Sequence, residues 1–224
     1  MEILLDTANV ADIRKYHAYY DITGVTTNPT ILSREKAGFF DLMTEIRGII
    51  GTKDLHVQVT AETSEEMLKE AEAIVKRIGK EGLYIKVPVN EEGLKTIKAL
   101  HREGIGTTGT AVYSVQQAML AASVGADYVA PYFNRMQDIN IDSASAISDM
   151  ICLFTDSHLP TKVVAASFKN VGQIMEALLA GAHAVTADPA LYTKMVESPV
   201  IEGAINGFRK DWIRTYGDKK IYEL

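Results

Sequence analysis

Short apolar runs alternate with longer segments of helical period along this chain, and that alternation limits its fold more than any other feature of its 224 residues. The apolar runs are rich in Val, Ile, Thr and Tyr and mostly end in Thr, Asn, Pro or Ser, as strands do. The predicted strands cover residues 3–5, 24–27, 55–59, 83–87, 106–112, 128–130, 162–166 and 184–186. Strands that are apolar on both faces and alternate with helices form a parallel sheet covered by those helices.

The segments between the strands have the pattern of amphipathic helices. In residues 64–75 apolar side chains recur every three or four positions, and Ser64 precedes them as the expected N-cap. Asn90 opens a second helix, with Glu91 and Glu92 at the positive end of its dipole. The same pattern predicts helices over residues 115–122, 147–154, 171–179 and 204–213.

Eight strands, each followed by a helix, fit a closed (β/α)8 TIM barrel better than an open sheet. The alternative is an open doubly wound sheet, but no Gly-x-Gly-x-x-Gly follows the first strand and no Walker loop occurs. With 47% hydrophobic and 23% charged residues, the chain has the composition of a globular protein with one large core. We therefore predict a single domain over residues 1–224, with a barrel in about residues 1–190 and C-terminal helices in about residues 191–224.

Composition also limits the partners and the compartment. A net charge of −6 argues against nonspecific binding of nucleic acid. No apolar run approaches the roughly 20 residues that cross a bilayer, and the opening residues 1–6 are too acidic and too short for a signal peptide. The single cysteine, Cys152, excludes an intramolecular disulfide and fits a reducing cytoplasm. The five histidines show no metal-ligand spacing, so we expect a cytoplasmic protein with no metal, no membrane and no nucleic acid among its partners.

Polar side chains stand where the predicted strands end, which is where TIM barrels carry their chemistry. The first strand ends at Asp6, and the second ends in a Thr-Thr-Asn-Pro run that contains Asn28. Strand period places His56, Gln58 and Thr60 on one face of the third. Taken singly, each of these residues is also ordinary turn or helix-cap chemistry.

The fourth strand places Lys86 inside an otherwise apolar run, Leu-Tyr-Ile-Lys-Val-Pro-Val. Moving an ammonium group out of water is costly, so burial lowers the pKa of such a lysine and increases its neutral fraction. A neutral amine is the nucleophile that forms a Schiff base with a carbonyl. On these residues alone, a lysine that snorkels out at the strand end remains an equal alternative.

The last strands predict an anion site. Thr108 and Thr110 carry hydroxyls on the fifth strand, Arg135 follows the sixth, and Ser167 and Lys169 follow the seventh. A guanidinium, a hydroxyl, an ammonium and a helix N-terminus together bind phosphate, and TIM barrels often place that site late in the strand order. Either cation alone would be interpreted as a solvated surface charge, but both follow strands that converge on one mouth.

Four segments together resemble the transaldolase family. They are Asp6-Thr7-Ala8, the Gly-Val-Thr-Thr-Asn-Pro-Thr run at residues 24–30, Lys86-Val87-Pro88, and the stretch from Arg135 to Ser167. The resemblance covers nearly the whole chain in order, and the Thr-Thr-Asn-Pro and Lys-Val-Pro motifs are its most specific parts. Within the family the chain is most similar to the short bacterial branch that contains the fructose-6-phosphate aldolases.

The resemblance implies a role for each residue at a strand end. Lys86 would form the Schiff base, Asp6 would transfer protons, and Asn28 would hold the bound ketose. The other substrate-binding residues would be Thr26, Thr108, Thr110, Arg135, Ser167 and Lys169, the last three around the phosphate. No cofactor is implied, because the iminium serves as the electron sink.

Three positions distinguish the aldolase branch from true transaldolases. Gln58 stands where transaldolases carry a glutamate that orients a catalytic water, Tyr132 where they carry phenylalanine, and Thr108 where they carry asparagine. The resemblance therefore implies a class I aldolase that cleaves fructose 6-phosphate reversibly to dihydroxyacetone and glyceraldehyde 3-phosphate, with Tyr132 and Gln58 assisting proton transfer. The alternative is a transaldolase of the pentose phosphate pathway, which passes the dihydroxyacetone unit from sedoheptulose 7-phosphate or fructose 6-phosphate to an aldose phosphate. A non-catalytic sugar-phosphate-binding barrel is disfavoured because Lys86 and Asp6 are both present.

The chain after the eighth strand is longer than the barrel needs. Ile205, Phe208, Trp212 and Ile213 form an apolar stripe at helical spacing. On the residues alone, the stripe is expected to pack onto the chain's own barrel. The resemblance implies instead a homo-oligomer, a pentamer or a decamer of two stacked rings, in which this tail is an arm that reaches a neighbouring subunit.

Overall fold

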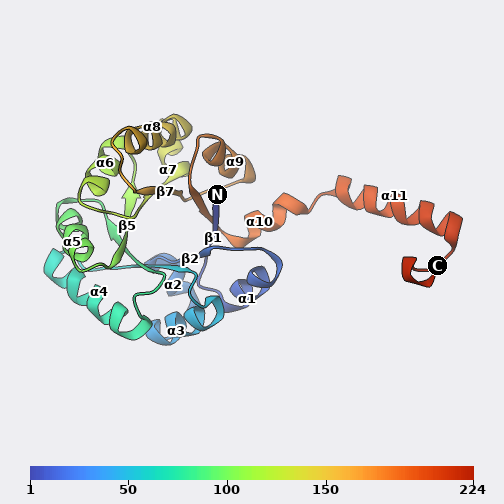
Figure 1. Ribbon diagram of the computed structural model, residues 1–224, viewed down its shortest axis with the longest axis horizontal. Coiled ribbons are helices and arrows are strands. Elements are labelled where there is room, and N and C mark those ends of the chain that lie inside the picture. Colours follow the sequence, from blue (N-terminus) through green and yellow to red (C-terminus); the bar gives the residue numbers. More distant parts are fainter.

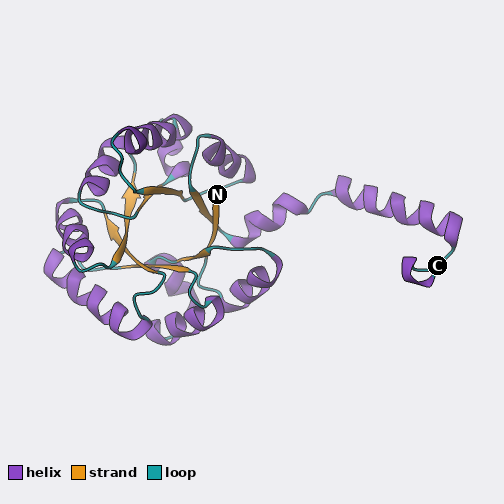
Figure 2. Ribbon diagram, in the orientation of Figure 1, coloured by secondary structure: helices purple, strands orange, loops and turns teal.

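The computed structural model describes residues 1–224 and contains a closed barrel of parallel strands ringed by helices (Figures 1 and 2). The strands are β1 (Glu2–Asp6), β2 (Gly24–Thr26), β3 (Asp54–Gln58), β4 (Leu83–Pro88), β5 (Gly106–Val112), β6 (Tyr128–Pro131), β7 (Lys162–Ala165) and β8 (Ala184–Ala187). Each strand pairs with the next in chain order, and β8 closes the barrel against β1. All eight predicted strands are confirmed to within one residue at each end, and closure excludes the open sheet.

Helices follow the strands, and all but the last of them lie around the barrel (Figure 2). They are α1 (Val10–Tyr19), α2 (Pro29–Glu35), α3 (Phe39–Ile50), α4 (Ser64–Ile78), α5 (Glu91–Arg102), α6 (Val115–Ser123), α7 (Phe133–Asp138), α8 (Ser143–Asp156), α9 (Val171–Leu179), α10 (Pro189–Val196) and α11 (Pro199–Tyr216), followed by a 3-10 turn, η1 (Ile221–Glu223). All the predicted helices are present, and several run longer than the sequence pattern indicates.

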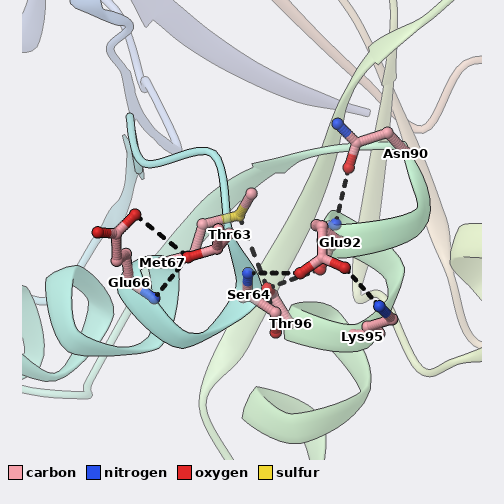
Figure 3. Close-up of polar contacts among 9 residues, drawn as sticks. Thr63, Ser64, Glu66, Met67, Asn90, Glu92, Lys95 and Thr96 are labelled. Carbon is pink, nitrogen blue, oxygen red and sulfur yellow. Dashed lines mark hydrogen bonds and ion pairs between the residues drawn. The ribbon is translucent and has the colours of Figure 1, made fainter.

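One helix start differs from the prediction (Figure 3). The N-cap of α4 is Thr63, whose hydroxyl accepts the Glu66 backbone N–H, and Ser64 is the first residue of the helix. Thr63 has the extended backbone that a cap requires, and the Ser64 N–H donates instead to the Glu92 carboxylate on α5 at 2.8 Å. Asn90 caps α5 as expected, by accepting the Gly93 N–H.

Alternate residues of the strands face the helices or the barrel interior. On β3, Leu55 and Val57 belong to the large apolar cluster beneath the helices, whereas His56 and Gln58 face inward. The prediction for Thr60 is wrong: β3 has ended, Thr60 is exposed, and its hydroxyl donates to the Glu70 carboxylate at 2.8 Å. Strand period applies only while the strand continues, so the inward face stops at Gln58.

The N-terminal end of the barrel is closed by charged and aromatic side chains. Glu2 forms an ion pair with Lys162 at 2.6 Å and accepts the Tyr128 hydroxyl at 2.9 Å. The strands finish at the opposite end of the barrel, which is the end where TIM barrels carry their active sites.

The last helix leaves the barrel (Figure 1). No residue of α11 is buried, and Phe208 is 72% exposed. The expectation that the apolar stripe packs onto the chain's own barrel is therefore wrong. Trp212 packs locally instead, with its ring 4.5 Å from that of Tyr216 and its Nε1–H donating to the Lys219 carbonyl oxygen. A Pro at the start of α11 separates it from α10 and lets the chain turn outward. None of the helices is both long and apolar enough to cross a membrane.

Candidate functional site

A cavity of about 440 Å³ opens at the C-terminal ends of the strands. Eight of the predicted site residues line it: Asp6, Asn28, Gln58, Lys86, Tyr132, Arg135, Ser167 and Lys169. The three predicted threonines lie beside the cavity rather than in its lining. Thr26 and Thr110 place their hydroxyls on the cavity residues Asp6 and Tyr132, at 2.7 and 3.0 Å. Thr108 lies 2.8 Å from His56, one layer deeper in the barrel.

Lys86 lies at the base of the cavity and is only 6% exposed. Its Nζ donates a hydrogen bond of 2.8 Å to the Thr27 carbonyl oxygen on the far side of β3. Burial lowers the pKa of the Lys86 ammonium, and the nearby Asp6 carboxylate opposes that shift. The snorkelling alternative is excluded, since the side chain stays inside the barrel.

Asp6 ends β1 and shares this buried environment. Burial raises the pKa of its carboxyl, while Lys86 and the hydrogen bond from Thr26 act to lower it. Opposite shifts bring the pKa values of an amine and a carboxyl closer together, so a proton can pass between the bound substrate and this pair at low cost. The arrangement suits a reaction that needs both a neutral amine and a proton carrier.

A second proton-carrying group lies across the cavity. Tyr132 follows β6, and its hydroxyl is 3.0 Å from Thr110 Oγ1.

Gln58 is the next inward-facing residue after His56 on β3, and it is the cross-strand partner of Lys86. The Gln58 Oε1 atom is buried and has no hydrogen-bond donor. A buried acceptor of this kind needs a donor, which a substrate hydroxyl or a bound water supplies.

The far side of the cavity is cationic. The Arg135 guanidinium lies 4.9 Å from the centre of the Tyr132 ring, and Lys169 lies beyond Ser167 at the end of β7. Ser167 has a left-handed backbone, with φ of 65°, which a residue with a side chain adopts at an energetic cost. Strained backbone of this kind is typical of sites that hold a group in a fixed direction. The predicted phosphate residues are thus together, on one wall.

The lining also contains residues that the sequence did not identify as site residues, among them Arg34, Thr186 and Asp188. Thr186 and Asp188 stand at the end of β8, so the strand-end rule that identified the other residues would have identified them too. Arg34 lies one helical turn after Thr30 on α2, and helical period from the Asn-Pro turn would have placed both on the cavity side. Arg34 lowers and Asp188 raises the pKa of Asp6.

Two comparisons with known proteins give matches over nearly the whole chain. Residues 3–218 match the model of a family described as transaldolase/fructose-6-phosphate aldolase. A protein of Streptococcus pneumoniae (strain ATCC 700669 / Spain 23F-1), named as a probable fructose-6-phosphate aldolase, is 44% identical over 223 residues. That alignment covers 99% of this chain and 100% of the relative.

Proposed function

Because the chain belongs to the transaldolase/fructose-6-phosphate aldolase family, and is thus an enzyme of the class I aldolase/transaldolase type, we propose that it cleaves fructose 6-phosphate reversibly through a Schiff base on Lys86. The products are dihydroxyacetone and glyceraldehyde 3-phosphate. The observation that carries this proposal is the buried Lys86 amine at the base of the cavity, with its pKa lowered and with Asp6 nearby.

The reaction begins when neutral Lys86 Nζ attacks the C2 carbonyl of the ketose. The resulting carbinolamine loses water and becomes an iminium. A base removes the proton of the C4 hydroxyl, the C3–C4 bond breaks, and its electron pair moves to the iminium nitrogen and forms an enamine. The aldehyde leaves, C3 is protonated, and water releases dihydroxyacetone and the free lysine. We assign proton transfer to Asp6, with Tyr132, Gln58 and a water assisting.

The cationic wall of the cavity, formed by Arg135, Ser167 and Lys169, offers positive charge and hydrogen-bond donors to the phosphate. Arg135 and Lys169 provide positive charge in a protein whose net charge is −6, and the Ser167 hydroxyl adds a donor. Asn28 caps α2 with its side-chain oxygen, which leaves its amide nitrogen to donate to a ketose hydroxyl. Thr26 and Thr110 position Asp6 and Tyr132 through hydrogen bonds.

The second candidate, transaldolase activity, uses the same enamine but passes it to an aldose phosphate. Gln58 favours the aldolase, because a neutral amide beside Lys86 lacks the charge of the transaldolase glutamate. Supplying fructose 6-phosphate with and without erythrose 4-phosphate separates the two activities. Cleavage that depends wholly on the added aldose phosphate would establish the transaldolase.

Trapping tests the Schiff base directly. Borohydride reduction in the presence of dihydroxyacetone should leave a stable adduct on Lys86, located by mass spectrometry of peptides. Lys86→Met should lose both the adduct and the cleavage activity, whereas Lys98→Met, on the exposed face of α5, should keep both. An adduct elsewhere, or full activity in Lys86→Met, would overturn the proposal.

We further propose a cytoplasmic homo-oligomer in which residues beyond about 190 form an intersubunit arm on a single barrel domain. An unpaired, exposed Cys152 fits the reducing cytoplasm. The exposed stripe of Ile205 and Phe208 on α11 supports the arm, because apolar area of this kind marks a protein interface. Sedimentation should show a pentamer or decamer, and Phe208→Asp should reduce its size while Lys210→Asp does not. A wild-type monomer, or equal sizes for both variants, would contradict the arm.

A further inference from the structure

The barrel interior beneath Lys86 holds a polar pair that the proposed chemistry does not use. His56 on β3 is 0% exposed and Thr108 on β5 is 1% exposed. The His56 Nδ1 atom lies 2.8 Å from Thr108 Oγ1. Burying a polar side chain costs free energy unless its hydrogen bonds are made. A buried pair at this position therefore suggests a role beyond packing.

Strand register places this pair next to Lys86. Lys86 pairs with Gln58 on one side and with Thr108 on the other, so β4 runs between the two strands that carry the pair. His56 is in register with Tyr84, two residues before Lys86. Thr108 is thus level with Lys86 and His56 with Tyr84, so the contact between His56 and Thr108 runs diagonally across the inner face of β4, between Lys86 and Tyr84.

The His56 ring is held in one orientation from below. It stacks on the Tyr84 ring at 4.7 Å and meets the Tyr128 ring edge-on at 5.1 Å. Burial, together with Lys86, lowers the pKa of His56 to about 3, so the imidazole is neutral and carries one ring proton at neutral pH. The ring position is thus fixed, and its single proton lies on either Nδ1 or Nε2.

The partners of the two ring nitrogens decide that choice. His56 Nε2 is buried and has no hydrogen-bond partner. An orphaned N–H is rarer in proteins than an under-satisfied acceptor, so the proton belongs on Nδ1, where it donates to Thr108 Oγ1. The Thr108 oxygen then acts as the acceptor, which leaves its own hydrogen free to donate to another group.

We propose that His56 is a positioning residue for the Schiff-base reaction and that it acts through Thr108. Its hydrogen bond holds the Thr108 side chain in place beside Lys86 and leaves the Thr108 hydroxyl hydrogen free to donate there. This inference rests on the proposed function of Lys86. It assigns no covalent step to His56, whose contribution is to hold two neighbouring groups in place before the ketose binds.

Two conservative substitutions separate positioning from mere packing. The side-chain amide nitrogen of Asn occupies the place of Nδ1, whereas that of Gln occupies the place of Nε2. His56→Asn should keep kcat within about threefold, because it still donates to Thr108, while His56→Gln should lower kcat by about 10- to 100-fold with a smaller change in KM. Thr108→Val, which keeps the shape of the side chain, should lower kcat similarly and covers the case in which His56→Gln does not fold.

Two further measurements distinguish this inference from the Schiff base itself. The rate of borohydride trapping with dihydroxyacetone should fall in His56→Gln and Thr108→Val relative to wild type. Solid-state 15N spectra of histidine-labelled protein, with His56 assigned by its loss in His56→Asn, should show a protonated Nδ1. Equal kcat in the Asn and Gln variants, an unaffected Thr108→Val or a protonated Nε2 would overturn the role of His56. A wild-type protein that forms no adduct would instead overturn the proposed function, while the 15N spectra would still test the tautomer.

Discussion

The Thr26 hydroxyl donates a 2.7 Å hydrogen bond to Asp6 Oδ1, and this bond opposes the burial that raises the pKa of the Asp6 carboxyl. The two residues end neighbouring strands, where Asp6 pairs with Thr26 in the β1–β2 register. Closure of the barrel brings Asp6, with Thr26 behind it, into the cavity that Lys86 also lines. We therefore expect the balance between burial and hydrogen bonding at Asp6 to set the pH range of the proposed reaction.

Removing this hydrogen bond should move that range. In Thr26→Val the pKa of Asp6 rises further, because the ionised carboxylate loses a donor, so the acidic limb of the kcat/KM profile moves to higher pH. Activity measured within that limb should fall by about tenfold, the factor for a charge-assisted bond of about 1.5 kcal/mol. Thr23→Val is the matched control, since its hydroxyl donates to the Ile3 carbonyl away from the cavity. An unchanged acidic limb would rule out Asp6 as the group that controls it.

The cationic wall should discriminate between phosphorylated and unphosphorylated aldehydes. Arg135→Gln should raise KM for glyceraldehyde 3-phosphate by about 10- to 100-fold, because it removes a charge-assisted donor to the phosphate. The effect on glyceraldehyde, measured in the direction of synthesis with dihydroxyacetone, should be far smaller. Arg102→Gln on the exposed end of α5 should change neither value. Equal effects on the two aldehydes would show that Arg135 does not bind the phosphate.

A charge placed at position 58 should slow formation of the Schiff base. In Gln58→Glu a carboxylate faces Lys86 across the strand pair, so the pKa of the lysine rises and its neutral fraction falls. Trapping by borohydride at pH 7 should slow by about tenfold, and the ratio of transfer to cleavage with erythrose 4-phosphate should rise. Gln116→Glu adds the same charge on the exposed face of α6 and should leave the trapping rate unchanged. A rate in Gln58→Glu equal to that of wild type would remove the electrostatic link between these residues.

Buried His56 should also make folding sensitive to acid. Its pKa is lowered from 6.5 in the unfolded chain to about 3 in the folded protein, so below pH 6.5 the unfolded state binds the additional proton. The free energy of unfolding then falls with decreasing pH, by up to about 1.4 kcal/mol per pH unit from this group alone, until the folded pKa is reached. Urea unfolding at fixed protein concentration, at pH 7 and pH 5, measures that loss.

The matched variants separate His56 from the other titrating groups. His56→Asn should lose less stability than wild type between pH 7 and pH 5, whereas His158→Asn should follow wild type. His158 is exposed and has a left-handed backbone that Asn tolerates. Parallel pH dependence in wild type and His56→Asn would mean that folding does not lower the pKa of His56.

Local sequence patterns were enough to predict much of the architecture. Strand period, apolar runs on both faces and polar residues at the strand ends are properties of a few consecutive residues, and they predicted the eight strands, the barrel and the cavity position of Asp6, Gln58 and Lys86. The same reasoning failed at Thr60, because where a strand stops depends on pairing with its neighbours rather than on the period. It also misplaced the N-cap of α4, where Thr63 and Ser64 offer the same chemistry one position apart.

The sequence by itself determined the repeating βα order and the presence of a lysine inside an apolar strand, because both depend only on the spacing of residues close together in the chain. Only the tertiary structure decided which groups meet. Lys86 Nζ bonds to Thr27, 59 positions earlier, and His56 faces Thr108, 52 positions later. It also directed the apolar stripe of α11 away from the barrel instead of onto it. These outcomes follow from closing eight strands around a common interior, because that step buries Lys86 and Asp6 side by side and shifts their pKa values toward each other.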